Sequence, residues 1–314
     1  MRKIRMLAVG ATALALLLSA CQPGDGSSPS TSSGAPSTPA ELPTVIVGSA
    51  DFDESAIVAE IYAQALEAAG FPVDRHLFFG TRETTLPALE SGELNLMPEY
   101  IGSLTAALGA TADADPAVTF SNLDAALADR GLAAFNFSLG QDYDGFAVTA
   151  ETAQEFDLET MSDIAPIADQ FTWGVPSECA GRDLCEIGLR DVYGIDINTI
   201  PRVENLGACS AAMAEALNAN AIQVARVCTT QAAIAQYNFA VLVDDLGLNP
   251  AQNLAPVVTE ELAAAGGDLL ESTLNAISAE LTTDELSELN LLVSVELQDL
   301  AEVAQAWLED RGLI

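Results

Sequence analysis

Basic residues are nearly absent from this chain of 314 residues. It contains 11 Lys and Arg against 46 Asp and Glu, a formal net charge of −35, and its only lysine is Lys3. A surface of this sign repels phosphate backbones and anionic lipid headgroups. The composition therefore excludes nucleic acid as a partner. Because cations are so few, an arginine near an expected ligand position is informative, and Arg82 and Arg182 are the two that meet this description.

Groups that could perform catalysis are also scarce. His76 is the only histidine, and it falls in the middle of an expected strand, which favours a surface or edge position. The sequence has no Gly-x-Ser-x-Gly motif and no cluster of residues with the spacing of metal ligands. An exported hydrolase would need a nucleophile beside a base. We therefore predict a protein that is not an enzyme and has no cofactor or metal, with a hydrolase as the weaker alternative.

The amino terminus has the layout of an export signal. Three basic residues within the first five positions precede an apolar run over 6–18, which is too short for a stable membrane anchor. Leu18-Ser19-Ala20-Cys21 resembles a bacterial lipobox, in which the cysteine becomes the lipidated first residue of the mature protein. We predict a lipoprotein signal peptide over 1–20 and a lipidated Cys21. Removing the signal leaves eight arginines against 46 acidic residues, a net charge of −38.

A low-complexity segment follows Cys21. Residues 22–41 are almost entirely Ser, Pro, Gly, Thr and Ala, a composition that buries little apolar area. We predict that 21–42 is the lipidated cysteine with a flexible tether. The expected localisation is the extracytoplasmic face of the cell membrane, with the globular part held there by a lipid anchor.

Four further cysteines lie in the second half of the chain. An even number of cysteines in an exported protein favours disulfides. Cys179 and Cys185 are close enough in sequence to pair around the loop that contains Arg182. Four cysteines allow three connectivities, and a bond between Cys209 and Cys228 would complete this one. A zinc site is the alternative, but it lacks histidines and a Cys-x-x-Cys spacing.

Strands and helices alternate through the first third. Short apolar strands are expected over 45–47, 73–79 and 94–97, with an amphipathic helix after the first that ends at Gly70. This order is typical of a parallel sheet that binds ligands at the carboxyl ends of its strands. The residues just after those ends are the first candidates for ligand contacts, although any one of them could be an ordinary loop residue: Ser49, Phe52, Thr81, Arg82, Tyr100 and Ser103.

The second half contains a further set of alternating elements. We expect strands over 146–148, 172–175, 197–200, 222–227 and 239–243, with helices between them. The segment 252–258 is apolar again and is interpreted as a return to the first group of strands. Thr282 and Glu285 form a capping-box pattern at the start of a carboxyl-terminal helix.

Several longer stretches resemble one family. They are GSADFDESAIVAEIYAQALEAAG, GTRETTLPALESGELNLMPEYIGSLTAAL, GFAVTAETAQEFDLETMSDIAP, VLVDDLGLNPAQNLAPVV and LTTDELSELN. Together they resemble the substrate-binding proteins of quaternary-amine ABC importers, the receptors for glycine betaine, choline and carnitine. The resemblance extends from about residue 44 to the carboxyl terminus.

The resemblance implies an α/β fold of the periplasmic-binding-protein-like type II class. Two α/β lobes would be joined by two crossover strands, near 140–145 and 239–245, with the ligand in the cleft and closure by hinge motion. On this basis residues 43–143 plus 244–314 are expected to form lobe 1, and residues 144–243 lobe 2.

The resemblance also implies a type of pocket. A quaternary ammonium cannot donate a hydrogen bond, so aromatic faces surround it, while a ligand carboxylate needs an arginine or other donors. The residue after Pro-Glu in this family is a cage tyrosine, here Tyr100, with Ser103 one turn later; Tyr143 and Phe52 are further candidates. Arg182 matches the family's carboxylate clamp, and Arg82 is the second choice. An ordinary ion pair is the alternative for both arginines.

Two cage positions of the family depart from its pattern. Where many relatives have an aromatic residue, this chain has Cys228 before Thr229-Thr230-Gln231, and a tyrosine of the relatives is replaced by Gln252. Thr229, Thr230, Gln252 and Asn253 are therefore included as candidate ligand contacts, because hydroxyl and amide groups suit a more polar solute.

The resulting prediction is a solute receptor of an ABC importer. It would bind a small zwitterionic or quaternary-ammonium osmoprotectant and deliver it to the permease and ATPase subunits, acting as a monomer. The alternatives are a receptor for another small polar solute and a ligand sensor that signals to a membrane partner.

Overall fold

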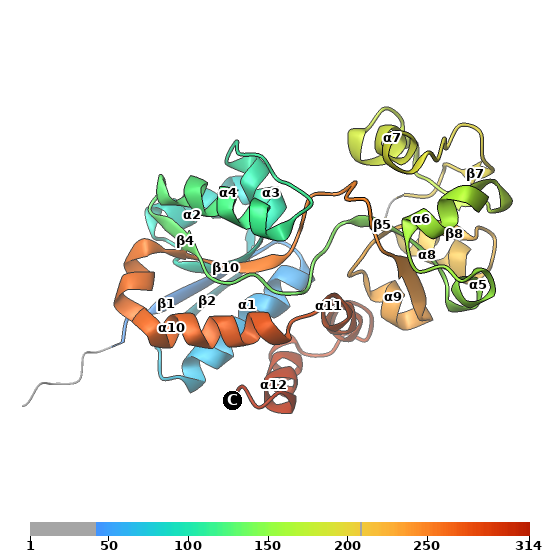
Figure 1. The fold of residues 1–314 in the computed structure, drawn as a ribbon. Helices are drawn as coiled ribbons and strands as arrows, with labels where there is room; N and C mark the ends of the chain where they lie inside the picture. Colours follow the sequence, from blue (N-terminus) through green and yellow to red (C-terminus); the bar gives the residue numbers. More distant parts are fainter. Residues whose placement is uncertain (1–41, 208) are drawn as a thin grey trace, which may run out of the picture. The chain divides into compact units, whose positions relative to one another are not determined.

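The computed structural model describes residues 42–207 and 209–314, and these form two five-stranded sheets with helices on their faces (Figure 1). The predicted signal peptide, Cys21 and the predicted tether up to residue 41 lie outside the described residues. Within the described part, no helix is both long and apolar enough to cross a bilayer.

The first sheet has the strand order β2-β1-β3-β10-β4. β1 pairs in parallel with β2 and β3, whereas β10 runs antiparallel to both β3 and β4. The parallel arrangement expected for the first three strands is therefore correct, but the complete sheet is mixed. His76 lies on β2, an edge strand as expected. The strands are Val45–Ala50 (β1), Val73–Gly80 (β2), Leu96–Tyr100 (β3), Leu132–Ala134 (β4) and Leu254–Thr259 (β10).

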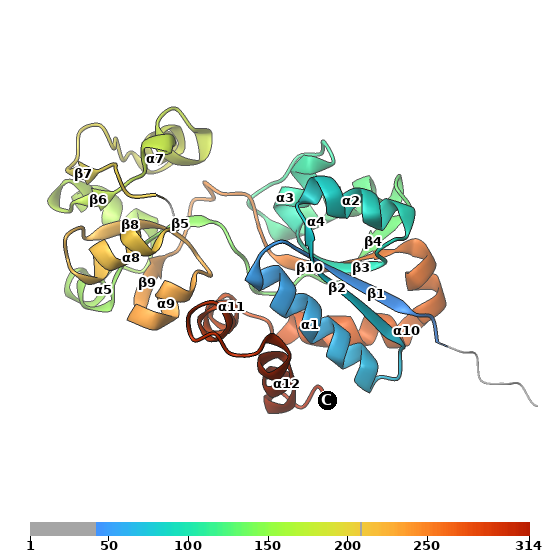
Figure 2. The same ribbon diagram turned by 180° about the vertical axis from the view of Figure 1, so that it is seen from behind.

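Helices cover both faces of the first sheet. α1 and α10 pack on one face, and α2, α3 and α4 on the other, as the two opposite views show (Figures 1 and 2). α11 and α12 pack beside α1, and the core on that side includes Trp307. The helices are Asp53–Ala68 (α1), Arg82–Ser91 (α2), Ile101–Ala107 (α3), Pro116–Ala128 (α4), Glu260–Glu280 (α10), Thr283–Asn290 (α11) and Leu300–Asp310 (α12).

The second sheet has the strand order β7-β6-β8-β5-β9. β5 is antiparallel to β8 and β9, and β6 is parallel to β7 and β8. Trp173 is fully buried at the centre of its core. The strands are Asp144–Thr149 (β5), Trp173–Gly174 (β6), Arg202–Val203 (β7), Val224–Cys228 (β8) and Phe239–Leu242 (β9).

Short helices surround this second sheet. Residues of α5, α6, η1 and α7 contribute to one core cluster, and residues of α8 and α9 to another. They are Ala150–Phe156 (α5), Met161–Ile164 (α6), Ala165–Gln170 (η1), Ser177–Cys179 (η2), Asp183–Ile187 (η3), Gly188–Tyr193 (α7), Ala211–Asn218 (α8) and Ala232–Tyr237 (α9). A further short helix, Leu291–Val295 (η4), follows α11.

One predicted strand is wrong. Residues 197–200 form a turn, and the strand lies at Arg202–Val203 instead. The Asp196 side chain accepts a hydrogen bond from the Asn198 amide at 3.0 Å, and its carbonyl accepts the Thr199 amide at 2.9 Å. This local Asx turn competes with strand pairing. The apolar residues at 197 and 200 suggested a strand because they give no sign of the turn.

The chain passes twice between the sheets, over 135–143 and over 243–253. These two connections meet at an isolated antiparallel bridge between Gln141 and Asn253. Beside them, Gly102 opens α3 against the second connection, where a Cβ atom would collide with the Ala251 carbonyl oxygen. Only glycine allows this close approach.

Candidate functional site

A cavity of about 330 Å³ lies at the carboxyl end of β3 and the amino end of α1. The rest of its wall comes from the connection before β5, from the segments before α8 and around the end of β8, and from the carboxyl-terminal helices α11 and η4. It is lined by Phe52, Asp53, Glu54, Tyr100, Asp142, Cys209, Cys228, Thr230, Gln231, Ala232, Asn290 and Ser294.

Two aromatic rings form one wall of this cavity. Phe52 is the residue before α1, and Tyr100 is the last residue of β3, so the two strand ends bring them together. Their rings are stacked, with an interplanar angle of 17° and centroids 6.3 Å apart. Phe52 remains 44% exposed, which leaves aromatic surface available to a ligand. Such faces attract cations.

Glu54, in the first turn of α1, is buried in contact with Tyr100 and is only 6% exposed. The Tyr100 hydroxyl donates a hydrogen bond to one carboxyl oxygen, and the Asn290 side-chain amide donates to the other at 2.5 Å. Burial, followed by repulsion from Asp142, raises the pKa of Glu54 to about 7. The Glu54 carboxyl therefore changes its protonation state near neutral pH.

Asp142 supplies a second carboxyl from the connection before β5. It accepts hydrogen bonds from the Thr230 amide at 3.3 Å and from the Thr229 hydroxyl at 3.4 Å. Burial raises the pKa of Asp142 in spite of these donors. The cavity thus combines aromatic faces with two carboxyls that are costly to ionise without a cation.

A smaller cavity of about 220 Å³ adjoins the first and shares Phe52 and Tyr100 with it. Thr81 and Arg82 line this second cavity. The Arg82 guanidinium donates two hydrogen bonds to Glu99, at 3.0 and 2.7 Å, so it forms the ion pair that was the alternative interpretation.

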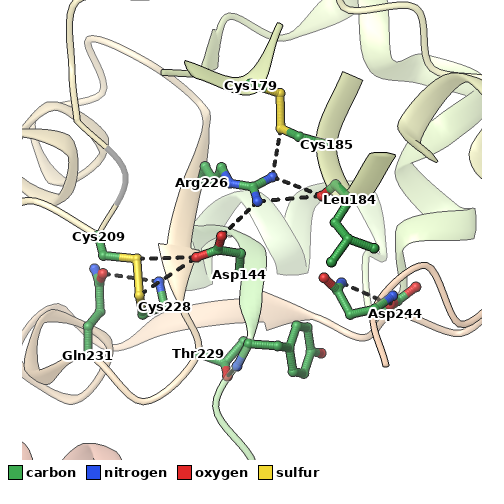
Figure 3. A network of polar contacts seen from close by, with 12 residues as sticks. Asp144, Cys179, Leu184, Cys185, Cys209, Arg226, Cys228, Thr229, Gln231 and Asp244 are labelled. Carbon is green, nitrogen blue, oxygen red and sulfur yellow. Dashed lines mark hydrogen bonds and ion pairs between the residues drawn. A yellow bond between two sulfur atoms is a disulfide. The ribbon is translucent and has the colours of Figure 1, made fainter. Parts of the chain in front are cut away.

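A second polar network lies on the second sheet, centred on Arg226, and it adjoins the larger cavity through Cys209 and Cys228 (Figure 3). Arg226 on β8 is 5% exposed and donates to Asp144 at 2.9 Å and to Cys185 Sγ at 2.7 Å. Cys185 is bonded to Cys179, and Cys209 to Cys228, the connectivity that the sequence suggested. Asp144 lies beside both sulfurs of the second bond, but because these sulfurs are bonded to each other they offer no thiolate to a metal.

Comparisons with known proteins identify the family. Residues 43–310 match the family described as the substrate-binding domain of ABC-type glycine betaine transport systems. The chain belongs to this family. That match spans most of the chain and includes every residue that lines the two cavities. Its members are extracytoplasmic solute-binding proteins of transport systems rather than enzymes.

Individual relatives have low sequence identity to this chain, but the matches cover most of both chains. The chain is 24% identical to the carnitine transport binding protein OpuCC of Listeria monocytogenes over 284 residues, which cover 85% of this chain and 86% of the relative. It is also 24% identical to the glycine betaine-binding protein YehZ of Escherichia coli over 279 residues, 85% of this chain and 90% of that protein.

Solved structures confirm the fold. Apo YehZ from Escherichia coli superposes with a TM-score of 0.79 at 22% identity, covering 86% of this chain and 99% of the other. A crystal structure described as a glycine betaine/carnitine/choline ABC transporter gives a TM-score of 0.77 at 25% identity, with the same coverage of both chains. The predicted periplasmic-binding-protein-like α/β architecture with two sheets is correct.

Some candidate residues form hydrogen bonds within the protein and do not line a cavity. Ser49 is fully buried and accepts the Phe78 amide at 2.7 Å. Ser103 donates from its amide and hydroxyl to Gln252 Oε1, each at 3.0 Å. Asn253 donates to the Ser138 carbonyl at 2.9 Å. None of these four candidates lines the two cavities, so their expected ligand contacts stay predictions.

The remaining candidates divide in the same way. Thr230 lines the larger cavity, whereas Thr229 is buried and donates to the Gln141 carbonyl at 3.2 Å. Tyr143 lines neither cavity; its backbone amide donates to the Thr229 hydroxyl at 3.1 Å. Arg182 is exposed in the loop closed by Cys179 and Cys185 and lines neither cavity, so this arrangement gives its clamp role no support.

Sequence reasoning found Thr230 but missed the carboxyls of the cavity and Asn290. Glu54 was not singled out, and Asp142 sits unremarked between Gln141 and Tyr143 in a segment identified as a crossover. Both positions could have been found by asking which acids follow a strand end or flank a crossover. Asn290, at the end of α11, had no local signal, because only tertiary packing brings it to Glu54.

Proposed function

We propose that this chain is the solute receptor of an ABC importer and that it binds a small quaternary-ammonium osmoprotectant at the Phe52–Tyr100 cavity. The observation that carries the proposal is the stacked aromatic pair in one cavity with carboxyls, within a chain of the glycine betaine transport family. The ligands named for OpuCC and YehZ, carnitine and glycine betaine, belong to the same chemical class.

The physical match is specific to a cation that cannot donate hydrogen bonds. Methyl groups around a positive nitrogen pack against aromatic faces, and each ring contributes on the order of 1 to 2 kcal/mol when the cation is desolvated. Carboxyls beneath the rings add electrostatic attraction without needing a hydrogen bond. An ammonium or guanidinium ligand would lose its hydrogen bonds to water against the same rings.

The proposal includes how the receptor is held and with what it works. The signal over 1–20 and Cys21 support a lipid anchor at the extracytoplasmic face of the membrane. The permease and ATPase subunits of the importer are the proposed partners, and the receptor is a monomer without enzymatic activity. Residues 43–143 plus 244–314 and residues 144–243 are the proposed lobes, supported by the division of the strands between the two sheets.

Calorimetric titration of residues 42–314 tests the function. The panel is glycine betaine, choline, carnitine and tetramethylammonium, with glutamine and proline as amino-acid controls. At least one quaternary amine is expected to bind in the micromolar range, and Tyr100→Ala and Phe52→Ala should each weaken binding at least tenfold.

Phe78→Ala is the matched control for Phe52→Ala. Phe78 is 46% exposed, almost the same as Phe52, but it lines neither cavity. Its replacement should leave the affinity unchanged. Absence of binding to every quaternary amine, or equal loss in the Phe78 variant, would contradict the proposed function.

A further inference from the structure

The charges around the larger cavity all have one sign. Asp53, Glu54 and Asp142 line it, and its twelve lining residues include no arginine or histidine. Lysine is absent from the sequence after residue 3. The cavity therefore has three carboxyls and no side-chain cation on its described wall.

The arginines elsewhere in the described chain are already paired. Seven of the eight arginines from residue 42 onward form ion pairs with Asp or Glu, and the eighth is Arg182, which lines neither cavity. Arg82 lines the adjoining cavity, and its guanidinium is paired with Glu99 through Nε and one Nη nitrogen. Recruiting Arg82 to a ligand carboxylate would leave Glu99, 5% exposed, without its cation.

Three of the neutral donors at the cavity are also engaged with acceptors of the protein. The Tyr100 hydroxyl donates to Glu54, and the Ser294 hydroxyl donates to Asp53 at 2.6 Å. The Asn290 amide donates to Glu54 and to the Thr230 carbonyl, at 2.5 and 2.8 Å. A carboxylate on the ligand would be repelled by these carboxyls. To be bound by the same donors, it would also have to break their existing hydrogen bonds, and both effects cost free energy.

We propose that Glu54 and Asp142 are specificity-determining residues that make this site select ligands of net positive charge over zwitterions that carry a carboxylate. The inference rests on the proposed function, because it assumes that the quaternary ammonium binds beside Phe52 and Tyr100. A quaternary ammonium alcohol fits this chemistry: its cation faces the rings and carboxyls, and the Gln231 side chain at the same wall can hydrogen-bond a neutral hydroxyl.

The test compares ligands that share the trimethylammonium group and differ in the second group. Choline and tetramethylammonium are titrated into residues 42–314 at pH 7.5, in parallel with glycine betaine and carnitine. Choline is expected to bind at least tenfold more tightly than glycine betaine. Asp142→Asn should weaken choline binding at least tenfold and should weaken glycine betaine binding much less, so that the preference narrows.

Two further variants make the result interpretable. Asp169→Asn removes one charge from an exposed position in η1, outside both cavities, and should leave the choline preference unchanged. Arg182→Ala should leave the affinity for every ligand unchanged. If circular dichroism shows that Asp142→Asn does not fold, Glu54→Gln replaces it, and the preference for choline over glycine betaine is again expected to become smaller.

The outcomes separate the two proposals. Tighter binding of glycine betaine than of choline, or loss of binding in Arg182→Ala, would overturn the charge selection while leaving the receptor function intact. An unchanged preference in Asp142→Asn and Glu54→Gln would also overturn it. Binding of none of the four amines would overturn the receptor function itself, and the charge selection with it.

Discussion

A buried charge has an oppositely charged partner in the network on the second sheet but not among the residues lining the larger cavity beside the first sheet. On the second sheet, Arg226 is buried against Asp144, and its other donor atoms face Cys185 and the Leu184 carbonyl (Figure 3). Beside the first sheet, the buried Glu54 and the half-buried Asp142 have hydrogen-bond donors but no cation among the residues lining their cavity.

This difference separates a structural network from a site that is incomplete by itself. A buried charge that is paired within the protein is satisfied at all times, whereas carboxyls without a cation must hold a proton or gain a positive ligand. The Arg226 network therefore contributes to stability. The Glu54–Asp142 pair lowers the stability of the unliganded protein, and binding of a cation removes this destabilisation.

The largest effect should come from removing the cation of the satisfied network. Arg226→Ala leaves the Leu184 carbonyl without its donor and removes a buried side chain that packs 5.7 Å from the centre of the Phe146 ring, whereas the exposed Asp144 carboxylate returns to water. We expect the free energy of unfolding to fall by about 4 kcal/mol, chiefly through the cavity that remains, measured by urea denaturation.

Arg190→Ala is the control for this change. Arg190 forms an ion pair with Asp191, but both side chains are more than half exposed. Its removal should cost less than about 1 kcal/mol. Equal losses in the two arginine variants would contradict the structural role of the Arg226 network.

Removing the Cys209–Cys228 disulfide should have the next largest effect. This bond closes a separation of 19 residues, compared with 6 for Cys179–Cys185. The double variant Cys209→Ser/Cys228→Ser is expected to lose about 3 kcal/mol in urea denaturation, and Cys179→Ser/Cys185→Ser about 2 kcal/mol. Because Cys209 and Cys228 also line the larger cavity, only the first variant should weaken choline binding. The reverse pattern would place the ligand elsewhere.

The carboxyl site should have the opposite pH dependence to a paired acid. The pKa of Glu54 rises from its ordinary value near 4.5 to about 7 in the folded state, through burial and the nearby Asp142. Asp142 in turn faces Asp144, and Tyr100 is the other titratable group in contact with Glu54. The folded state therefore retains a proton that the unfolded chain releases, and stability falls as pH rises between 5 and 7.

Glu54→Gln tests this dependence because it removes the titrating group and keeps the shape. Relative to the wild type, the variant should gain stability on the order of 2 kcal/mol as pH rises from 5 to 7. Urea denaturation at several pH values measures the difference. Glu83→Gln, at an exposed position, is the control. A constant difference between Glu54→Gln and wild type across this range would contradict a raised pKa at Glu54.

The smallest effect is expected for Tyr100→Phe. The variant keeps the aromatic face and loses the hydroxyl that donates to Glu54, which should cost about 1 kcal/mol of stability. Choline affinity should fall by less than tenfold, in contrast to the larger loss in Tyr100→Ala. If both variants lose binding equally, the hydroxyl rather than the ring recognises the ligand.

The sequence predicted the framework better than the site. Apolar runs located most strands, and the amphipathic spacing before Gly70 located α1, because these signals are local. The strand expected over 197–200 failed where the Asp196 turn competed with it. The aromatic members of the cavity, Phe52 and Tyr100, follow strand ends and were found for that reason.

The polar part of the site depends on contacts distant in sequence. Glu54 contacts Tyr100 and Asn290, which are 46 and 236 residues away. Arg182 was selected by similarity to a family position, but in the structure it lies in an exposed loop outside both cavities. Arg226 was overlooked because a buried arginine within an apolar strand has no local pattern that distinguishes it.

The most direct test of an incomplete carboxyl site is proton release on binding. Choline is titrated into the wild type and into Glu54→Gln at pH 7, in two buffers with different enthalpies of ionisation. A cation lowers the pKa of adjacent carboxyls, so the wild type should release a fraction of a proton, and the observed enthalpy should depend on the buffer. Glu54→Gln should show a clearly smaller dependence. Tight binding of choline with no buffer dependence in the wild type would contradict the account.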